Sequence, residues 1–481
     1  MSERGLCSLY SGYLSSTASM DRLPVELHRE IFCHLAGRPW EDPDADSAAF
    51  DWLSEARAPY LLASVCRRWR ELALRTPALW AFIRLCDGIH ARQFGRARVN
   101  LSRAGKHPLY FILDGRRVGF LNHFFDGLQL VKQYAPRLVR CYIHIPYNTQ
   151  HENLAIFEQA MPLLRELRMI PTHGRSARLV VSPRSAFGSQ LTLRLLHLPD
   201  CPQLERLDSH AICIIPASSL GRLKRLSYNL RNSEAAPLWA TLTRTPALEE
   251  LIIVFPSDGW WRLQQLSADN SSRFENATRV ELLHLHHLAV FGSCNEFSWA
   301  DKAHLPALHT LTASVEHCDH MGPLFKALRQ QLRHLVITSI EDGTGTAYLG
   351  ARDAEALDQL YDLESFELRG LRTDMLRQQD QAFFEHLSGP WPSTSHAVVD
   401  VAGPRGWAAT LPRLVLRDCE LELEACETLA RFVHTRLQGR SPFIFELINC
   451  KLTRRPGTDP PWLAPVRIVF GGALVDGQHL P

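Results

Sequence analysis

Residues 411–419 read LPRLVLRDC, with apolar side chains at the first, fourth and sixth positions and a cysteine at the ninth. Successive side chains of an extended strand point to opposite faces. Leu414 and Leu416 would therefore face a core, and Val415 and Arg417 would face the other way. The stretch predicts a short strand that is buried on one face only.

The same phrase recurs along most of the chain. LRLLHLPDC from Leu193 keeps the final cysteine, and other copies carry conservative replacements or are weaker. A near-copy, PQLERLDSH from Pro202, falls out of frame. The copies begin at Leu138, Leu164, Leu193, Leu223, Leu248, Val280, Leu308, Leu332, Leu363, Leu411 and Pro442, mostly 24 to 32 residues apart.

Helical segments are expected between these strands, for example DHMGPLFKALRQQ and EACETLARFVHTRLQ. One strand and one helix per unit resembles the leucine-rich repeat, whose units span about 20–29 residues. The resemblance implies an irregular α/β solenoid over residues 136–475, with an insertion at about 388–407. An ordinary α/β domain is the alternative, but it has no need of one repeated strand phrase.

Residues that flank the last apolar position of each phrase would point away from the core. In repeat arrays such a face is the usual binding surface. We predict that a protein substrate binds there, to Tyr142, His144, His197, Asn229, His284, His286, Thr312, Glu367, Arg369 and Arg417.

Residues 23–37, LPVELHREIFCHLAG, predict an amphipathic helix. Pro24 suits the start of a helix, and Glu26 suits the positive end of its dipole. Apolar residues recur every four positions, which gives one apolar stripe. The acidic, proline-containing stretch that follows predicts an inserted surface loop over residues 38–58, with at most one short helical turn.

A second helix is expected to begin near Leu61, with Leu61, Val65, Trp69 and Leu72 on one face. Pro77 would end it, and TPALWAFIRL would continue as a turn and a strand. The arginines at 67, 68 and 70 lie off the apolar face, so a solvated surface explains them more simply than a phosphate-binding one.

Together the two helices resemble the F-box, the helical module that binds the Skp-type adaptor of cullin–RING ubiquitin ligases. The spacer between the helices is longer than in a minimal F-box. The following segment, HARQFGRARVNLSRAGKHPLYFILDG, is similar to one that follows the F-box in many basidiomycete-type members. The resemblance implies adaptor contacts through Leu23, Pro24, Glu26, Leu27, Ile31, Phe32, Leu35, Leu61, Leu62, Val65, Cys66 and Trp69.

The expected organisation is a tail (1–19), the F-box (20–85), a helix–strand connector (86–135) and the repeat array (136–475). By resemblance, the chain would be a substrate-recognition subunit of a Skp–cullin–F-box ligase and would contact the adaptor, the cullin–RING ligase and a protein target. It would not be an enzyme. The alternative is an interaction scaffold that uses the same surfaces without ubiquitin transfer.

Composition restricts the other classes of function. Lys and Arg number 53 against 51 Asp and Glu, so no overall charge attracts nucleic acid or anionic membrane. Neither a signal peptide nor a long apolar run is expected, so we predict no membrane partner. Twelve cysteines without a CxxC pair indicate free thiols in the cytoplasm or nucleus.

The sequence predicts neither a metal nor a cofactor. The histidine-rich stretches near residues 284–287 and 317–320 lack the spacing of known zinc sites. The sequence contains none of the common catalytic motifs, namely HExxH, GxSxG, the P-loop and the kinase motifs. No catalytic residues are therefore assigned.

Overall fold

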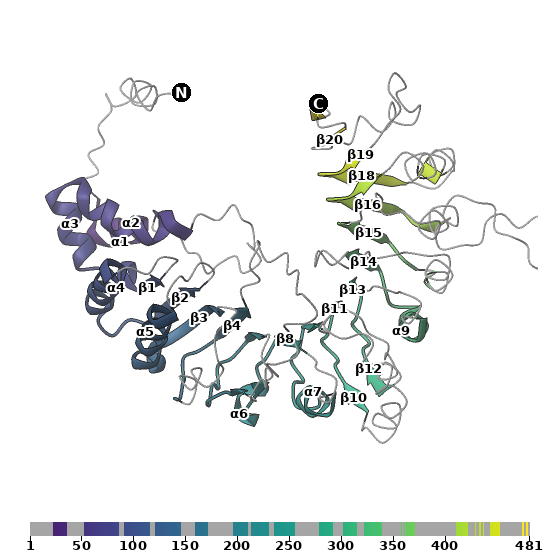
Figure 1. The fold of residues 1–481 in the computed structure, drawn as a ribbon, viewed down its shortest axis with the longest axis horizontal. Coiled ribbons are helices and arrows are strands. Elements are labelled where there is room, and N and C mark those ends of the chain that lie inside the picture. Colours follow the sequence, from purple (N-terminus) through teal and green to yellow (C-terminus); the bar gives the residue numbers. More distant parts are fainter. Residues whose placement is uncertain are drawn as a thin grey trace, which may run out of the picture. The chain divides into compact units, whose positions relative to one another are not determined.

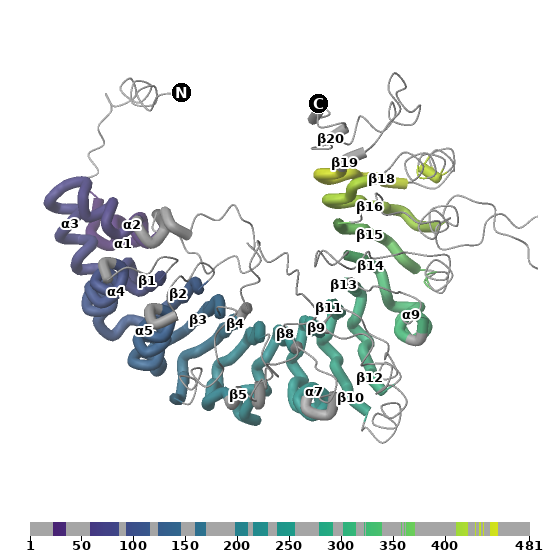
Figure 2. The backbone as a smooth tube through the Cα atoms, viewed as in Figure 1, coloured from purple at the N-terminus to yellow at the C-terminus, as the bar shows by residue number. Residues whose placement is uncertain are grey.

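The computed structural model describes most helices and strands of the chain, which Figures 1 and 2 show in colour. A few single residues between 357 and 436 are also described. The described ranges are 23–35, 52–85, 91–115, 121–145, 159–171, 196–209, 213–229, 235–254, 279–291, 302–314, 322–338, 362–370, 410–421, 443–452, 474–475 and 478–479.

A parallel sheet of 13 strands is the main feature of this α/β structure. The chain divides into two compact units, Met1–Leu164 and Arg165–Pro481. Three strands of the sheet, β1 to β3, belong to the first unit and the remaining strands to the second.

The first unit is mostly helical. Its strands β1, β2 and β3 pair in parallel, with Phe111 opposite both Ile83 and Cys141. Its elements are α1 (Val25–Leu35), α2 (Trp52–Val65), α3 (Arg67–Leu74), η3 (Pro77–Trp80), β1 (Phe82–Leu85), α4 (Ala91–Ala104), β2 (Leu109–Asp114), α5 (Leu121–Gln133), η4 (Ala135–Arg137) and β3 (Leu138–Ile145).

The predicted second helix is two helices. Cys66 has an extended backbone (φ −155°, ψ 171°), and its sulfur accepts a hydrogen bond from the Trp69 backbone N–H at 3.4 Å. It thus caps the start of α3, and the break separates the apolar residues of α2 from those of α3. The expectation that Leu61, Val65, Trp69 and Leu72 share one face was wrong.

The predicted inserted loop was also too long. Residues 52–58 of the proposed loop belong to α2, which includes the buried Pro59. Proline usually interrupts a helix because it lacks an N–H and crowds the preceding turn. That general rule led us to place the loop boundary too late. The rest of the loop, residues 38–51, and the predicted tail lie outside the described residues.

Trp80 holds the first unit together. Its ring is fully buried, and its Nε1–H donates to the Ala73 carbonyl at 2.8 Å. The Tyr60 ring of α2 meets it edge-on at 5.3 Å, and the Arg103 guanidinium of α4 lies 4.2 Å above it. One side chain from η3 therefore contacts three helices.

Two glycines explain local geometry in this unit. Gly105 follows α4 at φ +55°, the left-handed conformation that favours glycine after a helix. At Gly127 of α5, a Cβ would lie 2.6 Å from Leu113 Cδ1, so the missing side chain lets α5 approach β2 closely.

In the second unit the sheet strands follow one another in space in the same order as in the chain, and all pair in parallel. They are β4 (Glu166–Pro171), β6 (Arg206–Ser209), β8 (Arg225–Asn229), β9 (Glu250–Val254), β11 (His287–Phe291), β13 (Thr310–Ser314), β14 (His334–Thr338), β15 (Ser365–Arg369), β16 (Arg413–Arg417) and β18 (Ile444–Ile448).

Alternate residues of these strands form the core. Leu251, Leu288 and Leu311 lie opposite one another in register and are buried. Helices α7 (Ala235–Leu242) and α9 (Gly322–Leu328) also bury apolar side chains, and they lie on the same side of the row of strands (Figure 1). The other face of the strands is mostly polar but also carries apolar residues, such as Ile252 of β9, Phe291 of β11 and Ile448 of β18, and we call it the polar face.

Smaller elements lie between the main strands. A four-stranded sheet contains β17 (Glu420–Leu421), β19 (Lys451–Leu452), β20 (Leu474–Val475) and β21 (Gln478–His479). Two further pairs are β5 (Leu196–His197) with β7 (Cys213–Ile214), and β10 (Val280–Glu281) with β12 (Ala303–His304); a short helix, α6, spans Ala217–Leu220.

The repeated phrase located most strands in the correct register, but two copies were placed wrongly. The copy at Leu193 gives only β5, and the out-of-frame phrase from Pro202 contains the sheet strand β6. The copy at Val280 starts too early, because β11 begins at His287 and its buried residues include Leu288 and Val290. The leucines at 282, 283, 285 and 288 allowed two frames there, and the predicted frame was wrong.

The ninth position of the phrase marks the turn after the strand. Cys419 and Cys450 are buried there, and their thiols donate to the Leu368 and Leu416 carbonyls of the preceding strands at 3.5 and 3.3 Å. The residues just before them, Asp418 and Asn449, have φ of 55° and 54°. A buried thiol thus satisfies carbonyl groups where the strand pairing ends.

The division into units differs from the expected domain boundary. We placed the start of the array at residue 136, whereas β3 belongs to the compact unit that contains α1 to α5. The predicted helix–strand connector, 86–135, holds α4, β2 and α5, which belong to the first unit. The insertion at about 388–407 lies outside the described residues.

Candidate functional site

Several large apolar side chains of α1 and α2 are exposed. Leu61 and Val65 are each 61% exposed and Leu27 is 44% exposed, and Val25 is exposed as well. Leaving such side chains in water forgoes the free energy of burial, so grouped exposed apolar residues commonly mark a binding surface. These positions include three of the predicted adaptor contacts.

The other predicted adaptor residues have different environments. Phe32 and Leu62 are buried, and the Phe32 ring packs 4.9 Å from the Trp69 ring, which joins α1 to α3. Leu23, Ile31 and Trp69 are half-buried, whereas Pro24, Glu26 and Cys66 are exposed. Leu35 ends α1, and its side chain lies outside the described residues. The set therefore contains both core residues and surface residues.

The arginines of α3 are engaged locally. Arg67 pairs with Glu71 one turn later at 3.2 Å, and Arg70 Nε donates to the Ala63 carbonyl at 2.9 Å, across the break between α2 and α3. These contacts favour a helix-stabilising role over a phosphate-binding one, as the sequence suggested.

The structure brings together only some of the predicted substrate residues. Thr312, Glu367, Arg369 and Arg417 lie on sheet strands of the second unit, and Asn229 ends β8. Tyr142 and His144 are half-buried on β3 of the first unit. Three residues were placed wrongly on the sheet: His197 lies in the separate β5–β7 pair, His284 lies in an exposed turn, and His286 directly precedes β11 instead of lying on it.

A row of ionic contacts crosses the N-terminal strands of the second unit. Arg168 lies 3.0 Å from Glu166 and 3.3 Å from Asp208. Arg225 lies 3.8 Å from Asp208 and 3.2 Å from Glu250. His287 continues the row, with Nδ1 3.2 Å from Glu250 and Nε2 3.0 Å from the Thr312 hydroxyl.

This row pairs its charges internally. Burial raises the pKa of Asp208, although Arg225 and Arg168 beside it oppose the shift. Burial alone would also raise the pKa of Glu250, but the hydrogen bond from His287 and the charge of Arg225 hold it below its usual value. We therefore assign this row of ion pairs a structural role, which is to link neighbouring strands on the polar face.

Most residues of this row were not among the predicted substrate contacts. We assigned to the polar face only the residues around the last apolar position, but these strands place one more residue on that face, before their first buried apolar position. Glu166, Arg225, Glu250 and His287 are such residues, and the strand alternation extended by one step would have found them. Asp208 was missed through the misplaced copy at Leu193.

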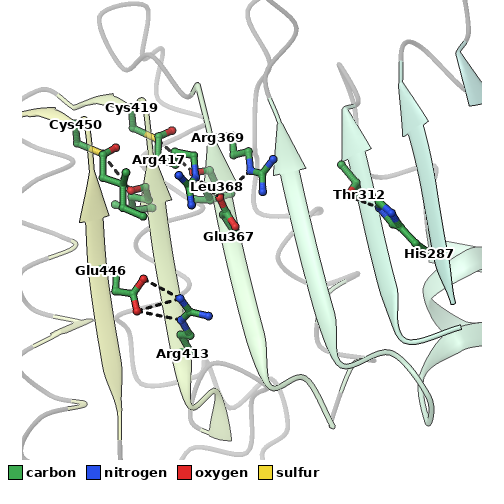
Figure 3. A network of polar contacts seen from close by, with 12 residues as sticks. His287, Thr312, Glu367, Leu368, Arg369, Arg413, Arg417, Cys419, Glu446 and Cys450 are labelled. Atoms are coloured by element: carbon green, nitrogen blue, oxygen red, sulfur yellow. Dashed lines mark hydrogen bonds and ion pairs between the residues drawn. The ribbon is translucent and has the colours of Figure 1, made fainter. Parts of the chain in front are cut away.

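A second polar group lies on β15, β16 and β18 (Figure 3). Arg369 Nε and Arg417 Nε approach the same Glu367 oxygen, at 2.7 and 2.8 Å. Arg413 and Glu446 form a separate pair with contacts of 2.8, 3.0 and 3.2 Å. Burial would raise the pKa of Glu367, but the hydrogen bonds from its two arginines hold that pKa below its usual value.

Histidines line the beginning of three neighbouring strands. The His309 ring meets those of His286 and His334 edge-on, at 5.7 and 6.2 Å. Partial burial and the neighbouring histidines lower the pKa of His309. Within the described part of the chain, no group of three or more His, Cys, Asp or Glu residues is arranged to hold a metal ion. Residues 317–320 lie outside that part.

Comparisons with known proteins add no family assignment. No protein-family model matches the chain, and the search of curated proteins finds no match either. Among the described helices, none combines the length and apolar character needed to cross a membrane. Function must therefore be argued from the two surfaces themselves.

Proposed function

We propose that this chain is the substrate-recognition subunit of a Skp–cullin–F-box ubiquitin ligase. The observation that carries the proposal is the exposure of large apolar side chains on α1 and on α2 at F-box positions. Leu27, Leu61 and Val65 match F-box positions and remain largely exposed, while Phe32 and Leu62 of the same motif form the core. A module with a separate core and a separate apolar surface is suited to docking a partner protein.

The proposed adaptor contact is energetically reasonable. Fully burying an exposed large apolar side chain contributes about 1.5–3 kcal/mol, and Leu27, Leu61 and Val65, which are 44–61% exposed, would each contribute roughly half of that. Association itself costs several kcal/mol or more in lost freedom and side-chain ordering. These three residues would therefore supply part of the affinity, and the motif's polar residues would orient the partner.

We propose that the second unit is an irregular leucine-rich-repeat array that binds the target. Its support is the order of the strands, one after another in parallel, with alternation of buried and polar residues. Parallel sheets that are covered on both faces instead carry nearly continuous apolar strands. The chain would raise the rate of ubiquitin transfer by holding the target close, without catalysing the transfer itself.

Adaptor capture tests the proposal. The full-length chain, a Leu61→Asp/Val65→Asp variant and a Val99→Asp variant would each be mixed with purified Skp-type adaptor. Val99 is a matched control because it is an exposed apolar residue on α4 of the same unit, outside the motif. We expect capture by the wild type and the control and its loss in the double variant.

Two results would contradict the proposal. Failure of the folded wild-type chain to bind the adaptor would refute the F-box assignment. Adaptor binding without recruitment of cullin would refute the ligase role and favour the scaffold. Circular dichroism of each variant would confirm that loss of binding does not reflect unfolding.

A further inference from the structure

The cluster on β15, β16 and β18 carries one unbalanced positive charge. It contains three arginines, at 369, 413 and 417, and two glutamates, at 367 and 446. Three positive charges against two negative charges leave a net charge of +1 among these five residues, which the solvent-screened charge of the exposed Asp418 offsets only in part. The lowered pKa of Glu367 keeps its carboxylate ionised at neutral pH, so the excess is present under physiological conditions.

The excess charge is localised at one end of the cluster. Arg413 binds Glu446 through both Nε and a terminal nitrogen, so that pair is satisfied. Arg369 and Arg417 share one glutamate oxygen and approach it only through Nε. Among the residues that the structure describes, the terminal nitrogens of these two arginines have no hydrogen-bond partner.

Their position suits an incoming side chain. Arg369 and Arg417 lie opposite each other at the C-terminal ends of β15 and β16, about half of each side chain being accessible, and Figure 3 shows them around Glu367. In the same row, Thr338 lies beside Arg369 and Ile448 beside Arg417. The two guanidinium groups supply donors for one acidic side chain. Thr338 and Ile448 lie where they can contact the residues next to that acidic residue.

We propose that the Arg369–Arg417 pair is a subsite for a carboxylate side chain, Asp or Glu, in an extended segment of the target protein. The inference rests on the proposed function only in taking the ligand to be a protein. Two guanidinium groups can donate paired hydrogen bonds to one carboxylate. One carboxylate neutralises the excess charge, whereas a doubly charged phosphate would leave the cluster negative.

The exposed Asp418 also affects how strongly the site would bind an acidic ligand. It follows Arg417 in the turn after β16, and its charge would oppose that of an incoming carboxylate. Replacing Glu367 by Gln keeps an oxygen for both arginines and raises the net charge of the cluster to +2. Both Glu367→Gln and Asp418→Asn should therefore strengthen binding of an acidic ligand.

The test uses the full-length chain and three fluorescein-labelled peptides of otherwise identical polar sequence, containing glutamate, glutamine or phosphoserine. Fluorescence anisotropy at low salt would measure binding. We expect selective binding of the glutamate peptide and at least about tenfold weakening in Arg369→Gln and in Arg417→Gln, since hydrogen bonds to charged groups are strong. Glu367→Gln and Asp418→Asn should each tighten binding.

Arg413→Gln is the matched control. It removes the same charge from the same face of β16, but its guanidinium is already occupied by Glu446, so we expect less than about a threefold change, as for indirect charge effects. An equal loss in this variant would overturn a specific subsite in favour of a diffuse positive field. Tighter binding of the phosphoserine peptide would overturn the assignment to a carboxylate.

The outcome is separable from that of the proposed function. Absence of glutamate-peptide binding, with adaptor capture intact, would overturn the subsite alone. Peptide binding without adaptor capture would overturn the ligase assignment and leave the subsite standing. The gain expected in Glu367→Gln keeps the test decisive even if an arginine variant folds poorly.

Discussion

Replacing Trp80 with Phe should destabilise the first unit more than any conservative change on its surface. The indole N–H bond to the Ala73 carbonyl is lost, but that carbonyl also accepts from the Thr76 N–H at 3.2 Å, so the cost is about 0.5–1.5 kcal/mol. The weaker stacking of Arg103 on a phenyl ring costs about 0.5–1 kcal/mol.

Lost ring volume adds to this cost. Complete truncation of a buried tryptophan costs about 3–5 kcal/mol, and Phe retains much of the ring, so we assign about 1–2 kcal/mol to the vacated space. The sum is about 2–4.5 kcal/mol, which is a large part of the usual stability of about 5–15 kcal/mol of a domain.

Hydrogen exchange of the full-length chain, read peptide by peptide, measures this effect. We expect faster exchange in α2, α3 and α4, the helices that Trp80 contacts, and no change in β13 to β16. Trp69→Phe is the control, since Trp69 is only half-buried. The reasoning fails if Trp80→Phe costs less than the Trp69 control or if exchange rises equally in the second unit.

Three further predictions concern single groups. In Glu367→Gln, the deficit in Tm relative to wild type should be largest at neutral pH, because the two arginines hold the pKa of Glu367 below its usual value of 4.5 against the effect of burial. The deficit should vanish as the pH falls below 4.5 through the folded-state pKa. A deficit in Tm that does not depend on pH would refute this. Iodoacetamide should label the exposed Cys66, and adaptor should slow the reaction, while burial raises the pKa of Cys141 to about 12 and should leave it unmodified, as mass spectrometry would show. Gly370→Val should destabilise the chain by about 1–2 kcal/mol because its φ is +68°, whereas Asp418→Gly at φ 55° should be nearly neutral in urea denaturation; a neutral Gly370→Val would contradict the role of this turn.

The strand phrase predicted much of the second unit because burial alternates with a fixed period. Wherever the phrase had one possible frame, as at Leu248, Leu332 or Leu411, the strand begins where expected. At Leu193 and Val280 nearby leucines fit the phrase in two frames. A single sequence carries no information about which of the two frames pairs with the neighbouring strands. The predicted frame at Val280 began too early along the chain, so His284 and His286 lie before β11 instead of on it.

The candidate sites could be predicted in outline only. Side-chain alternation placed Glu367, Arg369 and Arg417 on one face, but their grouping around a shared oxygen depends on pairing between β15 and β16, which are separated by a long connection. Likewise, helical periodicity grouped Leu61 with Trp69. Only the extended backbone at Cys66 reveals that one side chain is surface and the other joins the core.

The chain-order arrangement of the second unit's strands also bears on how it assembles. Each strand hydrogen-bonds only with the strands that precede and follow it in that order, so pairing requires closure of one local connection at a time. The entropy of closing a loop grows only slowly with its length, and the long segment between Arg369 and Arg413 therefore adds little to the cost. Folding can start at any adjacent pair and spread to both sides, and a damaged unit should loosen its neighbours before distant strands.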